Sequence, residues 1–214
     1  MIGFLGGTGP EGRSLALRMA LAGNKVVIGS RDAERAQEIA RKVEARAETG
    51  QVVGATNEEV AVQSEIVFIT VPYEGQSALL EPLKSALADK VVVDTVAPIS
   101  YEEGVFRSLL VPEGSAAEQA QELLPDSQVV AAFQNVSAVD LWKPDKTIEG
   151  DVVVCGDDVA AKQRVMVLAE QIKQIRAVDG GGLTSSRYVE EITALLLGIN
   201  RIYKAHTMIR IVGM

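Results

Sequence analysis

The first 35 residues restrict the fold more than any other part of the chain, because a strand, a glycine-rich turn, a helix and a second strand follow one another there. The apolar run Ile2–Leu5 leads into the turn Gly6–Gly12, which contains the pattern Gly-x-Gly-x-x-Gly. We expect a helix at Ser14–Ala22 and a strand at Lys25–Ile28. This order predicts a βαβ unit that binds a dinucleotide.

The three glycines of the pattern have separate expected roles. Gly7 permits the tight turn, Gly9 lets a pyrophosphate approach the backbone, and Gly12 lets the helix pack against the strand. Free N–H groups at the start of the helix would bind the phosphates, and Pro10 and Glu11, in the turn before it, are also expected to contact the cofactor. The alternative is a glycine turn that closes a βα unit and binds no ligand.

The end of the second strand indicates which dinucleotide is bound. NAD sites usually carry Asp or Glu there, which binds the ribose 2′-hydroxyl, whereas this strand is followed by Ser30 and Arg31. Ser30 can donate a hydrogen bond to a 2′-phosphate, and Arg31 can pair with it and stack on the adenine. Arg35 lies one helical turn further on, and Asp32 is expected to cap the helix Ala33–Ala47. NADP is therefore favoured over NAD; the alternative is a solvated Arg31 beside an ordinary helix cap.

The composition narrows the class of protein. A chain of 214 residues can bury a sizeable core and fits one α/β domain, or one with a small appendage. The net charge of −8 argues against nucleic-acid binding as the main role, and the single cysteine, Cys155, fits a reducing compartment. The first expected strand begins at residue 2, which leaves no room for a signal peptide, and no apolar run reaches transmembrane length. We therefore expect a cytoplasmic protein without membrane or nucleic-acid partners.

Strand-like and helix-like segments continue to alternate along the chain. Continuous apolar runs such as Ile66–Val71 and Val91–Asp94 are typical of strands buried on both faces of a parallel sheet. The alternation predicts an α/β fold with a doubly wound parallel sheet, which is a Rossmann-like NADP-binding fold. We expect residues 1–148 to form the NADP-binding domain, and residues 149–214 to form a smaller C-terminal region that ends in a long helix, about Ser185–Met208. The other expected strands are 51–54, 129–133, 151–155 and 175–178, and the other expected helices are 57–63, 75–88, 115–124 and 159–174.

Ligands of such sheets bind beyond the carboxyl ends of the strands. Besides the glycine turn and Ser30-Arg31, the segments expected at those ends are Val71–Tyr73, Thr95–Pro98 and Gln134–Ser137. The alternative is that Pro72 and Pro98 only end their strands.

The chain lacks the residues of several common dehydrogenase sites. Its only histidine, His206, lies near the C-terminus, where a cation suits the end of a helix. No tyrosine is followed four positions later by lysine, no cysteine or histidine cluster suits zinc, and Cys155 is expected to be a small core residue. We therefore expect neither a catalytic acid or base nor a metal. Such a site suits hydride transfer between two cofactors, which needs two rings held face to face with water excluded.

The sequence resembles the coenzyme F-420 (F420)-dependent NADP oxidoreductases of archaea and some bacteria over essentially its whole length. The resemblance rests on the glycine turn and on five further blocks, namely Gly29-Ser30-Arg31, Val71-Pro72-Tyr73, Ser115–Glu118, Val153–Asp158 and Leu183–Arg187. It implies reversible hydride transfer between NADP(H) and the deazaflavin F420, by a dimer or higher oligomer. The apolar face of the expected last helix is the candidate interface; the alternative is that this face packs on the protein's own sheet.

The resemblance also implies roles for individual residues. Those implied to bind NADP are Thr8, Ser30, Arg31 and Arg35, with Val71 and Pro72 beside the nicotinamide. The deazaflavin would stack on the nicotinamide near Pro98, Gln134 and Val136, with help from the C-terminal segment. Archaeal relatives can carry histidine where this chain has Gln134, which can donate a hydrogen bond to a ring carbonyl but cannot carry charge.

Two other functions fit the same residues. One is an NADPH-dependent reductase of another acceptor, such as a flavin, a ferric chelate or an imine, because Gln134 and the lack of acid/base residues leave the acceptor open. The other is a regulatory protein that binds NADP without turnover through the same glycine turn and Ser30-Arg31.

Overall fold

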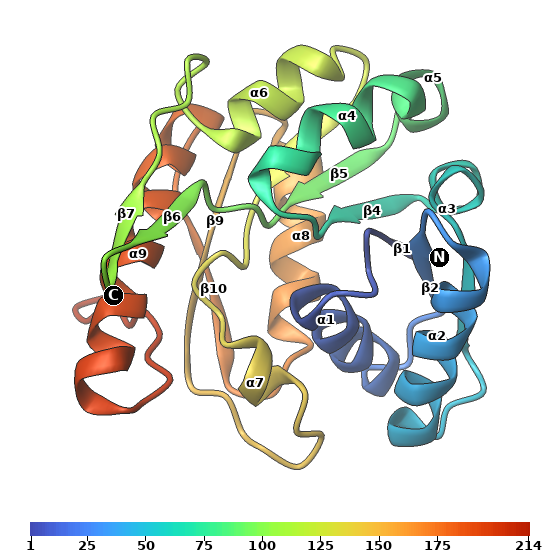
Figure 1. The fold of residues 1–214 in the computed structure, drawn as a ribbon, viewed down its shortest axis with the longest axis horizontal. Coiled ribbons are helices and arrows are strands. Elements are labelled where there is room, and N and C mark those ends of the chain that lie inside the picture. Colours follow the sequence, from blue (N-terminus) through green and yellow to red (C-terminus); the bar gives the residue numbers. More distant parts are fainter.

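An eight-stranded sheet with helices on both faces forms the centre of the protein (Figure 1). The computed structural model describes residues 1–214. The strands of this sheet are β1 (Ile2–Leu5), β2 (Val26–Ser30), β3 (Val52–Thr56), β4 (Ile66–Ile69), β5 (Val91–Asp94), β8 (Gln128–Ala131), β9 (Gly150–Gly156) and β10 (Ile175–Asp179). They lie in the order β10-β9-β8-β5-β4-β1-β2-β3, and all pairs from β3 to β8 are parallel. The doubly wound α/β sheet expected from the sequence is thus confirmed, and it is mostly parallel.

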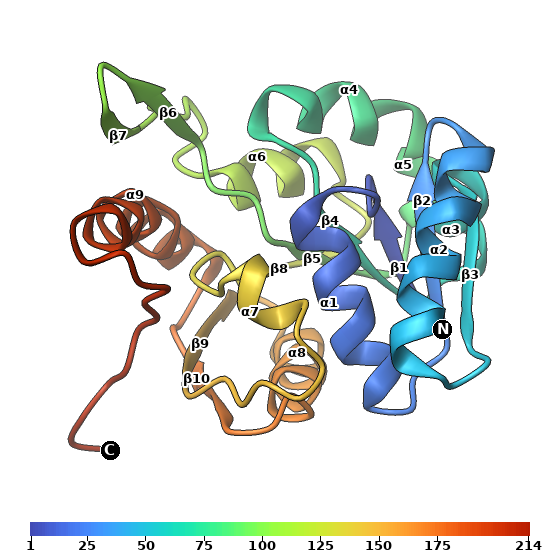
Figure 2. The same cartoon turned by 60° about the horizontal axis from the view of Figure 1, so that its bottom comes forward.

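The helices form one layer on each face of the sheet (Figures 1 and 2). The layer on one face consists of α1 (Pro10–Leu21), α2 (Ala33–Ala47), α7 (Ala138–Leu141) and α8 (Val159–Glu170). The other layer consists of α3 (Asn57–Gln63), α4 (Gln76–Leu80), α5 (Lys84–Leu87), α6 (Ala116–Leu123) and α9 (Ser186–Tyr203). Single turns of 3-10 helix occupy Tyr73–Gly75, Glu81–Leu83 and Leu183–Ser185.

The core consists of two apolar clusters, one under each helical layer. Successive strand residues alternate between them, so Phe4 and Phe68 stack at 4.8 Å in the cluster under α1, whereas Leu5 and Ile69 lie in the cluster under α3–α6. Because helices cover both faces, β4 and β5 are buried at every position. This explains why their sequences are nearly continuous apolar runs rather than alternating ones.

The pairing of β8 with β9 departs from the parallel sheet expected. These strands are antiparallel and pair only at their ends, Val130 with Gly156 and Ala131 with Cys155. A parallel neighbour needs a crossover, usually through a long helix, but only the four-residue α7 lies between β8 and β9. The chain therefore stays at the carboxyl edge, and most of β9 extends past the end of β8. The boundary expected at residue 148 lies within this connection, and the cluster under α1 includes residues on both sides of it.

Three helices predicted in the first 174 residues have different limits in the structure; one of them, expected at 159–174, ends at Glu170. The first begins at Pro10 rather than Ser14, because proline suits the first turn of a helix, where its missing N–H is not needed. The helix expected at 75–88 is divided into α4 and α5 by the turn Glu81–Leu83. Pro82 lies in that turn and lacks the backbone donor that a continuous helix would use.

The region around the last helix also differs from expectation. That helix ends at Tyr203 rather than near Met208, because Lys204 takes the left-handed conformation (φ 50°). The segment beyond it runs beside β9, where Asp151 N donates to Ile209 O at 2.8 Å. A hairpin of β6 (Ile99–Glu102) and β7 (Val105–Ser108), which the sequence did not predict, stands beside α9 and apart from the main sheet (Figure 2).

Candidate functional site

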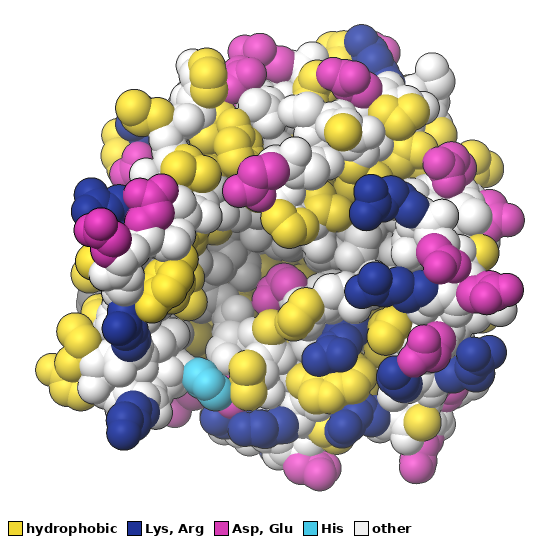
Figure 3. Space-filling view, viewed as in Figure 1, with side chains coloured by type: hydrophobic (Ala, Val, Ile, Leu, Met, Phe, Trp, Pro, Cys, Tyr) yellow, Lys and Arg dark blue, Asp and Glu magenta, His cyan; other side chains and the backbone are white.

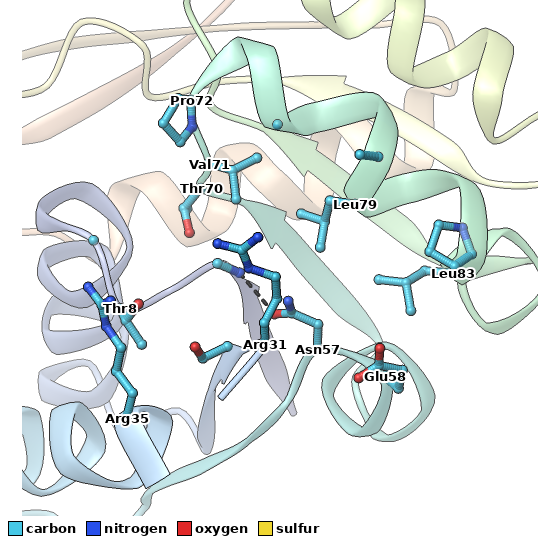
Figure 4. A pocket seen from close by; sticks show the side chains of 16 residues that line it. Thr8, Arg31, Arg35, Asn57, Glu58, Thr70, Val71, Pro72, Leu79 and Leu83 are labelled. Carbon is cyan, nitrogen blue, oxygen red and sulfur yellow. Dashed lines mark hydrogen bonds between the residues drawn. The ribbon is translucent and has the colours of Figure 1, made fainter. Parts of the chain in front are cut away.

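A cavity of about 510 Å³ opens at the carboxyl ends of β1, β2 and β4; we call it the first cavity. In Figure 4, Thr8 and Arg35 lie on one side of it, the Arg31 side chain extends over its middle, and Leu79 and Leu83 lie on the opposite side. Its lining consists of Gly6, Thr8, Gly9, Ser30, Arg31, Arg35, Asn57, Glu58, Thr70, Val71, Pro72, Gly75, Ala78, Leu79, Pro82 and Leu83. The first cavity is thus polar at the end of β2 and apolar along α4 and the turn that follows it.

The tight turn after β1 depends on Gly6 as well as on Gly7. Gly6 takes the left-handed conformation (φ 64°), and its N–H donates to Asn57 Oδ1 at 3.1 Å (Figure 4). Gly7 allows the close turn as expected, because a Cβ there would lie 2.7 Å from Phe4 Cβ and 2.9 Å from Phe4 O. Asn57 is the first residue of α3, directly after β3, and it stabilises the turn after β1 through this hydrogen bond.

The other two glycines of the pattern lie where a diphosphate needs them. A Cβ on Gly12 would lie 2.6 Å from both Gly7 Cα and Thr70 Oγ1, so only glycine lets α1 approach the turn. Gly9 is the N-cap of α1 without a side-chain cap, and the nearest atom to a Cβ there is Gly6 O at 4.0 Å. An open space beside an uncapped helix N-terminus fits a phosphate group.

The end of β2 and the start of α2 supply donors without acidic partners. Asp32 accepts hydrogen bonds from Glu34 N (2.9 Å) and Arg35 N (3.2 Å), which confirms it as the N-cap of α2. Ser30 Oγ accepts from Asp32 N at 3.2 Å. Arg31 and Arg35 line the cavity with exposed side chains, and the ion pair within α2 joins two other residues, Lys42 and Glu38. One hydroxyl and two free guanidinium groups fit a phosphate monoester.

A second cavity, of about 700 Å³, lies between α1, α7, α9 and the β6–β7 hairpin. Figure 3 shows a hollow on this face of the molecule, between the side formed by α9 and the side formed by α1. The lining residues are Glu11, Phe106, Gln134, Asn135, Val136, Ser137, Ala138, Val139, Thr193, Leu196, Leu197, Asn200, Arg201, Lys204, Ala205, His206 and Thr207. Because Gly9 lines the first cavity and Glu11 the second, the first turn of α1 separates the two.

The chain is strained where β8 leads into the second cavity. Phe133 is buried and adopts φ 73°, a conformation that a bulky side chain rarely takes. The following residue, Gln134, donates from Nε2 to Asp94 O at 2.9 Å, which leaves its Oε1 buried and without a partner. Strained backbone of this kind is often found at ligand sites, and the free Oε1 offers an acceptor to a bound group.

Arg18 holds the loop that forms the lower wall of the second cavity. Its buried guanidinium donates to the carbonyl oxygens of Asp140, Leu141, Lys143, Pro144 and Lys146. The Asp140 side chain contacts Lys146 Nζ at 2.7 Å and His206 Nδ1 at 3.0 Å, and these partners hold its pKa below the usual range despite burial. His206 thus joins the C-terminal segment to this loop instead of lying at a helix end as expected.

Two carboxyl groups lie buried between the sheet and α9. Glu190 accepts from Ala116 N (2.9 Å) and Ala117 N (3.2 Å) and so caps α6; burial raises the pKa of its carboxyl to about 7. Asp94 ends β5, accepts from Val96 N at 2.8 Å, and has one oxygen without a partner. Burial and the nearby Glu190 raise the pKa of Asp94 well above its usual value.

The structure divides the fifteen predicted cofactor residues into three groups. Seven line the first cavity: Thr8, Gly9, Ser30, Arg31, Arg35, Val71 and Pro72. Three line the second cavity: Glu11, Gln134 and Val136. Five line neither: Gly7, Pro10, Gly12, Tyr73 and Pro98. Tyr73 turns toward α6, where its hydroxyl accepts from Gln119 Nε2, and Pro98 begins the hairpin by accepting from Leu109 N.

Several residues that line the two cavities were not predicted from the sequence. Asn57 and Thr70 each follow a strand at the carboxyl edge, a position that the rule for ligand sites covers. The α9 residues Thr193, Asn200 and Arg201 had no such signal, because they reach the second cavity from a helix far along the chain.

The expected core position of Cys155 is confirmed, since it is fully buried and burial raises the pKa of its thiol to about 11. No group of three or more His, Cys, Asp or Glu side chains is placed to hold a metal ion. None of the helices combines the length and the apolar character needed to cross a bilayer.

Comparison with known proteins agrees with this geometry. Residues 1–98 match the family described as NADP oxidoreductase, coenzyme F420-dependent. The F420-dependent NADP reductase of Methanocaldococcus jannaschii is 41% identical over 220 residues, covering 100% of this chain and 98% of the relative. That of Methanothermobacter marburgensis is 43% identical over 205 residues, covering 93% and 92%.

A solved structure extends the similarity to three dimensions. The crystal structure of a protein from an Arthrobacter species superposes with a TM-score of 0.84 at 26% identity and covers 100% of this chain and 99% of that one. The two reductases match this chain over nearly its whole length at about 40% identity. The chain therefore belongs to the coenzyme F420-dependent NADP oxidoreductases.

Proposed function

We propose that this protein transfers hydride reversibly between NADP(H) and F420, with NADP in the first cavity and the deazaflavin in the second. The observation that supports this most strongly is full-length similarity to F420-dependent NADP reductases. The two cavities meet at the first turn of α1, with Gly9 on one side and Glu11 on the other. Beyond this turn, the nicotinamide of one cofactor and the ring of the other would stack face to face, as hydride transfer requires.

The first cavity has the groups that NADP requires. Ser30, Arg31 and Arg35 would bind the 2′-phosphate, and the Arg31 side chain can lie against the adenine. The open backbone at Gly9 would bind the diphosphate. Val71 and Pro72, at the apolar end, would border the nicotinamide.

The second cavity has the groups that a deazaflavin requires. Gln134 would contact the polar edge of the ring with its unpartnered Oε1, and Val136 would contact the ring face. Arg201 and Lys204 give this cavity positive charge, which suits an anionic acceptor. F420 accepts or releases a hydride when bound, and the role of the walls is to orient it and exclude water.

The test is to mix the purified protein with NADPH and oxidised F420 and to follow the visible absorbance of the deazaflavin, with NADH in parallel. We expect rapid bleaching with NADPH and little with NADH. Confirmed NADPH binding without bleaching would contradict the proposal and direct the search to a flavin, a ferric chelate or an imine as acceptor. Binding with no reduction of any of these would favour a regulatory protein.

We also propose that the protein is a homodimer that uses the outer face of α9. Tyr188, Leu195 and Ile202 recur every seven residues along that face and are 67%, 60% and 74% exposed. An apolar stripe of this kind is typical of a helix that packs against a second copy. A cytoplasmic location and the lack of nucleic-acid partners, expected from the single cysteine and the net charge of −8, stay predictions.

A further inference from the structure

Glu11 is an acidic residue in a place where the proposed reaction needs a proton. It lies in the first turn of α1, two residues after Gly9, and its side chain lines the second cavity. The hydride that NADPH delivers brings two electrons, so reduction of the deazaflavin also consumes one proton. No other acidic residue lines the second cavity.

The surroundings of Glu11 favour its protonated form. Its Oε1 is buried and has no hydrogen-bond partner, and burial raises the pKa of the carboxyl from 4.5 to about 8. The partial positive charge at the start of α1 acts in the opposite direction and favours the charged form. A diphosphate at Gly9 would add negative charge nearby and would hold the proton more firmly.

The basic side chains near Glu11 form no ion pair with its carboxyl group. Arg201 donates to Tyr101 Oη (3.0 Å) and to Gly104 O, and His206 contacts Asp140. On its own helix, the Arg13 guanidinium lies 4.9 Å from the centre of the Trp142 ring. Lys204 lies at the rim, beyond the end of α9, and forms no ion pair with Glu11. Because no basic side chain forms an ion pair with the Glu11 carboxylate, only protonation neutralises its charge.

We propose that Glu11 is a catalytic residue, whose carboxyl gives its proton to a ring nitrogen of the deazaflavin as the hydride arrives from NADPH. The Glu11 O–H bond breaks as the N–H bond forms, and the carboxylate then regains a proton from water. In the opposite direction the carboxylate takes the proton back from the ring nitrogen. This inference rests on the proposed function, and it assigns an acid where the sequence predicted none.

The decisive variant is Glu11→Gln, which keeps the shape of the side chain and removes its proton. At pH 7 we expect single-turnover reduction of F420 by NADPH to slow about 100-fold, with the dissociation constant of NADPH unchanged. In the unmodified protein we expect the rate of F420 reduction to fall above about pH 8, and the rate of oxidation of reduced F420 to rise as pH approaches 8. We expect neither of these two pH dependences (the two limbs of the profile) in Glu11→Gln. The control is Glu170→Gln, which removes an exposed carboxyl on α8 and leaves both limbs in place.

A second measurement does not need turnover. Glutamate labelled with 13C at Cδ is titrated by NMR in the protein with NADP bound, and the Glu11 signal is the one missing from Glu11→Gln. Titration near pH 8 supports the proposal; titration near 4.5, or an unchanged pH profile in the variant, overturns it. Failure of the unmodified protein to reduce F420 at any pH would overturn the proposed function instead, and the NMR titration would still report the state of Glu11.

Discussion

At the scale of single residues, Arg31 and Arg35 are distinctive because they carry the positive charge of the first cavity without an acidic partner. The protein as a whole is acidic, with a net charge of −8, so these side chains form a local anion site. Asp32, which lies between them in sequence, does not oppose this site, because its carboxylate caps α2 through Glu34 N and Arg35 N. Cofactor choice therefore depends on a few side chains at the end of one strand.

Replacing Arg31 with alanine should weaken NADP much more than NAD. A hydrogen bond to a charged group contributes about 1.5–3 kcal/mol, so we expect the KM for NADP(H) to rise roughly 10- to 100-fold and the weak use of NAD(H) to change little. Steady-state kinetics with both nucleotides checks this. Arg41→Ala, on the exposed side of α2, is the control. An equal loss for both nucleotides would show that Arg31 does not contact the 2′-phosphate.

Glu190 should make the stability of the protein depend on pH near neutrality. Its pKa in the folded state is about 7, above the ordinary 4.5, because it is buried. The folded state therefore keeps a proton that the unfolded state releases, and the free energy of unfolding falls as pH rises from about 4.5 to 7, by up to about 1.4 kcal/mol per pH unit. Above pH 7 this contribution is constant.

Urea unfolding of the unmodified protein and of Glu190→Gln between pH 5 and pH 8 measures this effect. The amide keeps one acceptor for the N-terminus of α6 and cannot titrate, so the difference in stability between the two proteins should change up to about pH 7 and then level off. Glu122→Gln, which removes an exposed carboxyl on α6, is the control. Parallel curves for the two proteins would mean that Glu190 is ionised throughout this range.

At the scale of elements, the second cavity depends on a loop that has almost no regular structure of its own. The connection from β8 to β9 contains only the four-residue α7, and Arg18 of α1 binds five of its carbonyl oxygens. The guanidinium thus satisfies the carbonyl groups of this loop, as backbone hydrogen bonds between strands do in a sheet. A helix of the first βαβ unit therefore shapes the site of the second ligand.

Removing this guanidinium should loosen the loop and the second cavity together. In Arg18→Met the five carbonyl oxygens lose a charged donor inside the protein, which we expect to lower stability by about 3 kcal/mol and Tm by roughly 6–12 °C. Hydrogen exchange should increase in residues 137–148, and F420 should bind more weakly while NADP binding changes little. Calorimetry, hydrogen-exchange mass spectrometry and ligand titration check these effects. Arg164→Met, which removes an exposed arginine on α8, should leave exchange in this loop unchanged.

At the scale of the whole molecule, α9 has two faces with different tasks. Its inner face contributes Thr193, Asn200 and Arg201 to the second cavity, and its outer face leaves Tyr188, Leu195 and Ile202 exposed. If two copies pair through the outer face, the helix that encloses the acceptor site is also held by the partner. Loss of the dimer would then weaken acceptor binding as well as assembly.

Leu195→Glu should convert the dimer to a monomer, because a charge at the centre of an apolar interface is left unpaired when it is buried. Sedimentation-velocity ultracentrifugation should show the mass halve, and the KM for F420 should rise. Val62→Glu, which places the same charge at a 69% exposed position on α3, should remain dimeric. A dimer that persists in Leu195→Glu would place the interface elsewhere.

The first cavity was largely predictable because its determinants are local in sequence. The glycine turn, Ser30-Arg31 and the apolar runs each act within a few residues, through turn geometry, a helix N-terminus and strand burial. Even there, the left-handed Gly6 and its partner Asn57 were not predicted, because the hydrogen bond that joins them spans 51 positions.

The sequence by itself determined the fold class, the dinucleotide turn and the basic side chains that favour NADP, since periodicity and turn chemistry are properties of short segments. Only the tertiary structure decided the antiparallel β9, the β6–β7 hairpin and the second cavity. That cavity is assembled from α1, the loop after β8, the hairpin and α9, so its shape depends on which distant segments pack together. The raised pKa of Glu11 was likewise decided by the tertiary structure. The residue type alone does not raise it; the burial that this packing creates does.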